Sequence, residues 1–295
     1  MMRALLLSLG VWSGIATVHA QPVSRQDPEP PSNNPRIVST ASGSAVAVTA
    51  NPLASQAALA ALRSGGHAVD AVVAAQAVLA VVEPQSSGLG GGSFLLLWEA
   101  QQRQLQMFDG RETAPLSSRS DDLLDAGGRP LPWRQATRSL FSIGIPGTVA
   151  LLWEAHQQHG QRPWSQLLAP AIALARDGFE PSPRLLRSIR LAQRLGSEHN
   201  AAFQRLYLPG GQAPPAGKRL RNPALARTLQ RLARHGGPAF YTGQLGRQIL
   251  TELAALSLKQ PRFQGWTAAD LASYEVIQRR ALCSEWRGYQ LCSAP

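Results

Sequence analysis

Apolar residues recur at helical spacing along most of the chain, and glycine or proline marks the end of several runs. The run Ala68–Val82 is apolar nearly all round, which is typical of a helix buried on several sides. The spacing predicts helices over residues 52–64, 68–82, 147–159, 164–177, 182–195, 222–235, 240–256 and 268–272.

Alternating apolar and polar residues predict a smaller set of strands. They cover residues 37–50, 93–98 and 104–108, with a short strand near 142–145 and another from Val276 onward. The chain contains no internal repeat. We therefore expect an α+β fold in which helices cover both faces of a small sheet.

Two cysteines flank one more predicted hairpin. If Arg287-Gly288 forms a two-residue turn, Cys283 and Cys292 face each other where antiparallel strands come closest. That arrangement suits a disulfide, although two unpaired buried thiols are the alternative. Two cysteines exclude a disulfide-dense scaffold and a four-cysteine zinc site.

The first twenty residues have the pattern of an export signal. A short basic start, Met1–Arg3, precedes an apolar run and the small residue Ala20, and the run is too short to span a membrane. A buried N-terminal helix is the alternative. Residues 21–36 are rich in Pro, Ser, Asn and Gln, which predicts a flexible leader before a domain over 37–295. An exported chain, periplasmic or secreted, has little access to nucleic acid.

Composition and charge narrow the possible classes of protein. The 295 residues are 44% hydrophobic, which excludes a mainly disordered chain. The formal net charge is +11, and residues 176–234 hold twelve basic and three acidic side chains. Such a block indicates either an acidic partner or arginines on the solvent faces of helices. One predicted helix, 182–195, places four arginines on one face: Arg184, Arg187, Arg190 and Arg194.

Few residues suggest chemistry by themselves. The glycine-rich segment Gly88–Gly92 follows a helix, enters a strand and lacks a Lys-Ser/Thr pair, so it favours a close backbone approach over phosphate binding. His156 and His159 lie one helical turn apart without an evident third ligand, so we expect a solvated pair rather than a metal site. No G-x-S-x-G motif is present, and no cofactor is implied.

Arg111 is the best candidate for ligand binding. It follows a predicted strand in an Asp-Gly turn, where its planar guanidinium can hold a carboxylate through two hydrogen bonds. The alternative is a structural ion pair with Asp109 or Glu112.

The segment VVEPQSSGLGGGSFLLLW, followed by DGRETAP, closely resembles the γ-glutamyltranspeptidase family. So do SIGIPGTVALLWEAHQQHG, WTAADLASYEVIQRRAL and WRGYQLCSAP, in order, from about residue 37 to the last residue. The resemblance implies the N-terminal-nucleophile hydrolase fold, a four-layer αββα sandwich. This chain would supply only the large-subunit part of it.

The resemblance also implies a mechanism. The family precursor cleaves itself, and the new N-terminal Thr of the small subunit attacks γ-glutamyl amides such as glutathione. Water or an amine then takes the glutamyl group. The family arginine that binds the glutamyl α-carboxylate corresponds to Arg111. The nucleophilic Thr has no counterpart here, so we expect the chain to need a small subunit for activity and for covering apolar surface.

Two other functions remain open at this point. A related N-terminal-nucleophile amidohydrolase, of the cephalosporin or glutaryl acylase type, would keep the fold and cleave another amide. Arg111 favours an α-amino-acid substrate, but the discriminating residues lie in the other subunit. A non-catalytic exported remnant that binds acidic partners would use the basic block at 176–234.

The predicted export signal can be checked directly. We expect the chain purified from the extracellular or periplasmic fraction to begin at Gln21, because Ala20 supplies the small residue at the cut. Mass spectrometry of the intact protein measures this. Retention of Met1 in exported material would contradict the prediction.

Overall fold

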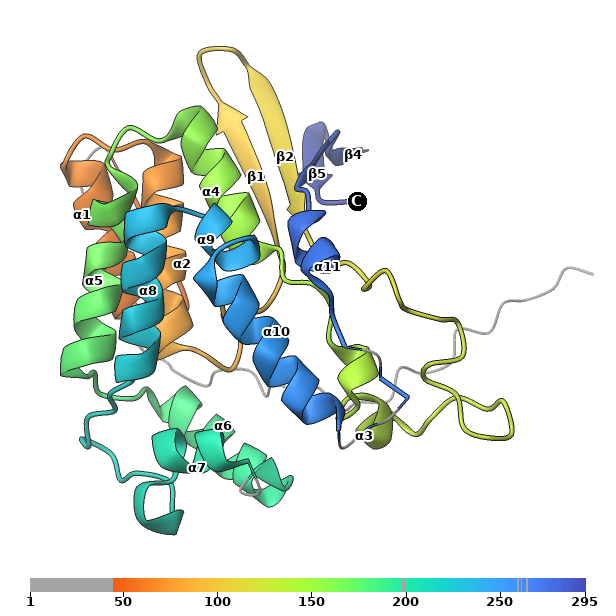
Figure 1. Cartoon of the computed structure of the whole chain (residues 1–295). Helices are drawn as coiled ribbons and strands as arrows, with labels where there is room; N and C mark the ends of the chain where they lie inside the picture. Colours follow the sequence, from red (N-terminus) through yellow and green to blue (C-terminus); the bar gives the residue numbers. More distant parts are fainter. Residues whose placement is uncertain (1–44, 198–199, 259, 261, 264) are drawn as a thin grey trace, which may run out of the picture. The chain divides into compact units, whose positions relative to one another are not determined.

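The computed structural model describes residues 45–197, 200–258, 260, 262–263 and 265–295. Figure 1 shows the arrangement of its elements. The helices are α1 (Pro52–Arg63), α2 (Ala68–Val82), α3 (Trp133–Ala136), α4 (Thr148–His159), α5 (Trp164–Asp177), α6 (Pro183–Arg194), α7 (Ala201–Tyr207), α8 (Pro223–His235), α9 (Pro238–Tyr241), α10 (Gln244–Ser257) and α11 (Ala268–Ala272), with 3-10 turns at Leu140–Ser142 and Pro209–Gly211. The strands are β1 (Ser93–Glu99), β2 (Gln104–Gly110), β3 (Ile277–Arg279), β4 (Leu282–Trp286) and β5 (Tyr289–Ser293).

Three helices begin in the same way, with a polar cap followed by proline. The proline has no N–H to leave unpaired, and the cap side chain accepts a hydrogen bond from a backbone N–H in the first turn. Local sequence therefore sets where α1, α6 and α8 begin. The cap and donor pairs are Asn51 with Leu53, Ser182 with Leu185, and Asn222 with Leu225.

The main hydrophobic core lies among α1, α2, α5 and α8. Helix α2 packs against α1 and α5, and α5 also packs against α8. The side chains of α2 are almost all Ala or Val, and Val73, Val78 and Val82 have no exposed surface. The prediction of a helix buried on several sides is confirmed.

Strands β1, β2 and β3 form an antiparallel sheet in that order, with Glu99 opposite Gln104 next to the first turn. Helix α4 packs against β1 and β2. Phe94, Leu96 and Trp98 alternate with the inward side chains of β1 and are 42%, 38% and 57% exposed. Within the described ranges, this face lacks the helical cover that the sequence analysis expected.

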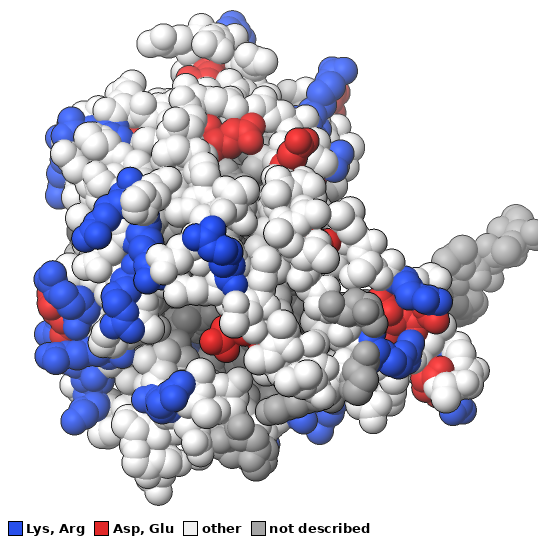
Figure 2. Space-filling model, in the orientation of Figure 1, with Lys and Arg blue, Asp and Glu red and all other residues white. Residues whose placement is uncertain are grey.

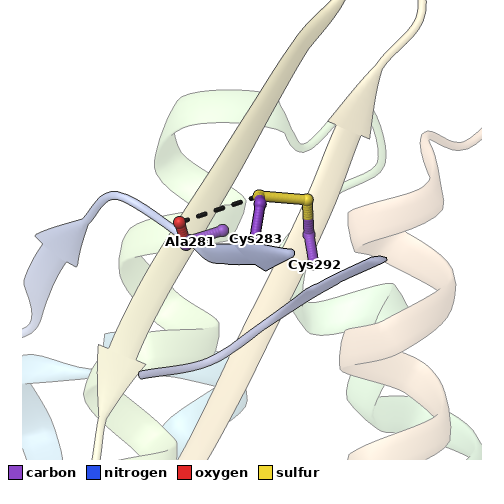
Figure 3. The surroundings of a disulfide bond; sticks show 3 residues. All are labelled: Ala281, Cys283 and Cys292. Carbon is purple, nitrogen blue, oxygen red and sulfur yellow. Dashed lines mark hydrogen bonds between the residues drawn. A yellow bond between two sulfur atoms is a disulfide. The ribbon is translucent and has the colours of Figure 1, made fainter. Parts of the chain in front are cut away.

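Strands β4 and β5 form a separate hairpin with the register expected from the sequence. Cys283 pairs with Cys292 across the hairpin. Arg287 and Gly288 form the turn and have φ values of 50° and 81°. Positive φ at both central residues is what a type I′ two-residue hairpin turn requires. The two cysteine sulfurs form a disulfide that joins the strands (Figure 3).

Some sequence-based expectations were wrong. Residues 45–49 of the expected strand at 37–50 are irregular, and Val46 and Val48 are 64% and 88% exposed. Alternation of apolar residues does not make a strand without a neighbouring strand to bond to. The rest of that segment, the export signal at 1–20 and the leader at 21–36 lie outside the described residues.

Two further predicted segments differ in the structure, and two helices are new. The segment expected as a strand at 142–145 follows a 3-10 turn, and Ile145 forms only an isolated bridge with Thr113. The expected helix at 240–256 is divided into α9 and α10, because Gly243 adopts an extended conformation between them. Helices α3 and α7 were not predicted.

Glu83 connects several elements at the end of α2. Its side chain is 1% exposed, and its carboxylate accepts hydrogen bonds from four side chains. A buried carboxylate is tolerated only when such donors replace the water it has lost. The start of α1, the start of α6 and the loop after α2 are therefore held at one point. The donors are Asn51 Nδ2 at 2.8 Å, Ser182 Oγ at 2.9 Å, Gln85 Nε2 at 2.6 Å and Arg184 Nη1 at 3.2 Å.

We expect Glu83→Gln to lower the free energy of unfolding by about 2 kcal/mol, because an amide NH₂ would face hydrogen-bond donors in a buried site. Urea denaturation of the purified chain measures this. Glu180→Gln is the matched control, since Glu180 is exposed, and it should change stability by less than about 0.5 kcal/mol. Equal stability of the two variants would contradict the role assigned to Glu83.

Candidate functional site

Arg111 lies directly after β2, and its backbone is fixed on both sides. The Arg111 N–H donates to Asp109 Oδ1 at 3.0 Å, and the Arg111 carbonyl accepts from Tyr274 Oη at 2.8 Å. The side chain is 69% exposed. A fixed backbone therefore presents a solvent-accessible guanidinium.

Glu112 joins this turn to the glycine-rich segment. Its Oε1 accepts from the Gly92 N–H at 2.7 Å, and its Oε2 lies 3.2 Å from Arg111 Nε. A Cβ on Gly92 would stand only 2.7 Å from the Glu112 backbone nitrogen. The close backbone approach expected from the glycines is thus made at Gly92, against Glu112.

In the structure, Arg111 can form a structural ion pair and still have donors left for a carboxylate. Its Nε pairs with Glu112, whereas the Asp109 carboxylate pairs with Arg279, whose Nε lies 2.6 Å from Asp109 Oδ2. The two Nη atoms of Arg111 have no hydrogen-bond partner among the described residues. Those two parallel donors are the edge of a guanidinium that binds a carboxylate.

The surroundings of the Arg111 turn shift the pKa values of two of its neighbours, Asp109 and Tyr274. Burial raises the pKa of the Asp109 carboxyl, but hydrogen bonds from the Arg279 side chain and the Arg111 N–H outweigh it, so the pKa lies below its usual range. Burial raises the pKa of Tyr274 to about 12, and the charges of Asp109 and Glu112 act in the same direction. Tyr274 therefore remains a neutral donor to the Arg111 carbonyl at neutral pH.

Arg111 and Glu112 border an open concavity of about 550 Å³. The backbone at Gly90 and Gly144, the hydroxyls of Ser118 and Ser142, and the ring of Phe141 complete much of its lining. No His, Lys or Cys is among the described lining residues, and the one carboxylate there, Glu112, is already engaged by the Gly92 N–H and by Arg111 Nε. The described surface can bind an anion but has no evident nucleophile.

The histidine pair is not solvated, contrary to expectation. His156 is 9% exposed and its Nε2 lies 2.8 Å from the Arg162 carbonyl oxygen. His159 Nε2 lies 3.0 Å from Gln106 Oε1. In the part of the chain that the structure describes, no group of three or more His, Cys, Asp or Glu side chains is placed to hold a metal ion.

Sequence reasoning alone singled out Arg111 but missed the residues that position it. Glu112 was considered only as an ion-pair partner, and the glycine spacing gave no indication of which residue Gly92 approaches. Tyr274 reaches Arg111 across 163 residues of sequence, and no local pattern connects them.

Comparison with known proteins identifies the family of this chain. Residues 54–295 match the Gamma-glutamyltranspeptidase family. The chain belongs to the γ-glutamyltranspeptidase family. Within it, Arg111 stands in the DGRETAP segment and Gly92 ends the EPQSSGLGGG segment quoted above.

Curated relatives of this γ-glutamyltranspeptidase family member are longer than the chain. It is 38% identical over 234 residues to glutathione hydrolase 2 of Arabidopsis thaliana, covering 79% of this chain and 38% of that protein. It is 33% identical over 248 residues to the glutathione hydrolase proenzyme of Bacillus subtilis (strain 168), covering 84% and 41%. The chain thus spans about two fifths of the length of these relatives.

Solved structures show the same fold. The γ-glutamyltranspeptidase of Helicobacter pylori has a TM-score of 0.79 and 29% identity, covering 86% of this chain and 71% of that one. A cephalosporin acylase from Bacillus halodurans has a TM-score of 0.70 and 28% identity, covering 83% and 45%. The expected α+β fold of the N-terminal-nucleophile hydrolases is confirmed.

Two neighbouring glycines test the contact between the glycine-rich segment and Glu112. We expect Gly92→Ala to lower the free energy of unfolding by about 1–3 kcal/mol, because the new methyl group overlaps Glu112. Gly90→Ala is the matched control, since a Cβ there meets no atom within 4 Å. Thermal and urea unfolding measure the stability of both variants. Equal losses of unfolding free energy in the two variants would show that the Gly92 contact with Glu112 does not stabilise the fold.

Proposed function

We propose that this chain forms the large-subunit portion of an exported γ-glutamyltransferase, a glutathione hydrolase, and binds the α-carboxylate of the γ-glutamyl group through Arg111. The observation that carries the proposal is the Arg111 guanidinium. Its Nε pairs with Glu112, its backbone is fixed by Tyr274, and its two Nη atoms are without a described partner at the edge of a concavity. The relatives from Arabidopsis thaliana and Bacillus subtilis are glutathione hydrolases, which favours glutathione as the donor.

The proposed reaction is acyl transfer to an N-terminal Thr of a small subunit, as family membership implies. The Thr α-amino group takes the hydroxyl proton while the Oγ atom bonds to the γ-carbonyl carbon. The amide C–N bond then breaks, and the proton passes to the leaving amine. Water, or the amine of an amino acid or peptide, attacks the acyl ester and releases the Thr. Arg111 fixes the other end of the glutamyl group and touches no bond that changes.

The exposed face of the sheet supports the need for a second polypeptide. Phe94, Leu96 and Trp98 form a row of large apolar side chains along β1, and the charged neighbour opposite Phe94, Asp109, is already paired with Arg279. Rows of this kind mark protein interfaces. We propose that the small subunit covers this face, as the αββα architecture of the family requires.

The proposed location is outside the cytoplasm, periplasmic or secreted. It rests on the export pattern of residues 1–20 and on the disulfide between Cys283 and Cys292, which persists in oxidising compartments. In the described ranges, none of the helices has the length and apolar character needed to cross a membrane.

A cephalosporin or glutaryl acylase activity is the competing assignment. A glutaryl group carries the same terminal carboxylate as a γ-glutamyl group and lacks only the α-amino group. Arg111 can therefore hold either one, and the choice depends on groups that recognise the amine. Comparing γ-glutamyl and glutaryl p-nitroanilides separates the two activities, since the proposed function requires the larger kcat/KM for the γ-glutamyl compound.

Substitution of Arg111 tests the proposed binding role. In enzyme assembled from this chain and its small subunit, we expect Arg111→Ala to raise KM for γ-glutamyl-p-nitroanilide about 100-fold, because a charge-assisted pair of hydrogen bonds is lost. Arg111→Lys should recover part of the loss. Arg103→Ala, an exposed arginine in the turn after β1, is the control and should leave KM unchanged. An unchanged KM for Arg111→Ala would refute the assignment.

A further inference from the structure

Helix α6 has two chemically different faces. Its inner face packs into the core, where Leu185, Leu186 and Ile189 are at most 5% exposed. Its outer face carries exposed residues at spacings of three and four, the periodicity of one helical stripe. We call five residues the α6 stripe: Arg187, Arg190, Leu191 and Arg194 on the helix, and Leu195, which caps its C-terminal end.

The α6 stripe combines exposed leucines with exposed arginines, whereas a helix face that only meets water has no use for the leucines. Leu191 and Leu195 are 40% and 42% exposed beside three exposed arginines. None of these arginines forms an ion pair with a carboxylate in the described part of the chain. A single exposed leucine requires no explanation, but leucines interleaved with unpaired arginines form a basic amphipathic surface.

The basic block of the sequence that contains α6 extends to α8. Residues 176–234 hold twelve basic and three acidic side chains, and α6 lies within that block. Figure 2 shows Lys and Arg side chains gathered over α8, with few Asp or Glu between them. The summed potential attracts anions before any contact is made.

The stripe is also held in place. At the start of α6, the Ser182 side chain donates to buried Glu83. At the other end, the Arg138 guanidinium donates to the Leu195 carbonyl, and Gln193 Nε2 donates to the Gly211 carbonyl at 3.1 Å. A positioned helix presents its arginines and leucines together without an ordering cost on binding.

We propose that the α6 stripe docks the protein peripherally on an anionic phospholipid membrane. Its arginines contact lipid phosphates, their apolar stems lie along the surface, and the two leucines enter the boundary between headgroups and acyl chains. A nucleic acid or an acidic protein would satisfy the arginines but leave the leucines in water, and the stripe has no aromatic side chain on which bases could stack. The inference is independent of the proposed enzymatic activity.

Vesicle co-sedimentation of the purified chain tests this proposal. We expect binding to vesicles of phosphatidylcholine mixed with phosphatidylglycerol, no binding to phosphatidylcholine alone, and weaker binding at higher salt. R187Q/R190Q/R194Q should weaken binding about 100-fold, because each arginine near an anionic surface contributes about fivefold. R63Q/R103Q/R134Q removes the same charge from exposed arginines elsewhere and should change binding only slightly. Equal losses in the two triple variants, or none in either, would overturn the proposal.

A second measurement reports leucine insertion. Leu191→Cys labelled with an environment-sensitive fluorophore should brighten and shift to the blue on mixed vesicles, whereas the same label at Arg63→Cys should not. Circular dichroism and melting of each variant verify folding. Poly-glutamate is the competing partner, and binding to it without binding to vesicles would overturn the membrane assignment. An unshifted Leu191 label on bound vesicles would do the same.

Discussion

The arrangement of the described domain depends on one buried carboxylate. Glu83 has almost no contact with water, so its charge is tolerable only if all of its donors stay in place. Those donors come from the caps of α1 and α6, from Arg184 in the first turn of α6, and from the loop after α2. The requirement of a single side chain therefore fixes three segments that are far apart in sequence. One of them continues into the glycine-rich segment, where the Gly92 N–H meets Glu112 beside Arg111.

Features that depend on neighbouring residues could be predicted from the sequence. The polar cap followed by proline at Asn51, Ser182 and Asn222 sets helix starts by local hydrogen bonds, and the Arg287-Gly288 turn sets the β4–β5 register by local backbone conformation. Features that depend on distant partners could not. The alternation at Val46 and Val48 looks the same whether or not a neighbouring strand is present. The segment at 240–256 keeps helical spacing across Gly243, where the backbone is extended.

At the candidate site, too, the sequence indicates what neighbouring residues determine and does not indicate what distant residues determine. The residues around Arg111 left two alternatives, an ion pair or a carboxylate-binding group, and the resemblance to a family favoured the second. In the structure the guanidinium has room for both, because Glu112 occupies Nε and leaves the two Nη atoms. The sequence does not reveal this, since the choice depends on whether Asp109 is already paired. Arg279, 170 residues away along the chain, occupies that carboxylate.

The chain exposes apolar side chains in two chemically different settings, and the difference separates their roles. The row of Phe94, Leu96 and Trp98 has one charged neighbour across the strands, Asp109, and Arg279 already pairs with it, so another protein surface can cover the row without leaving a charge unpaired. The leucines of the α6 stripe alternate with arginines whose charged ends need anions or water at the same moment. A protein core would leave those arginines buried without partners, at a high free-energy cost. A headgroup layer satisfies both kinds of group, because phosphates lie directly above hydrocarbon.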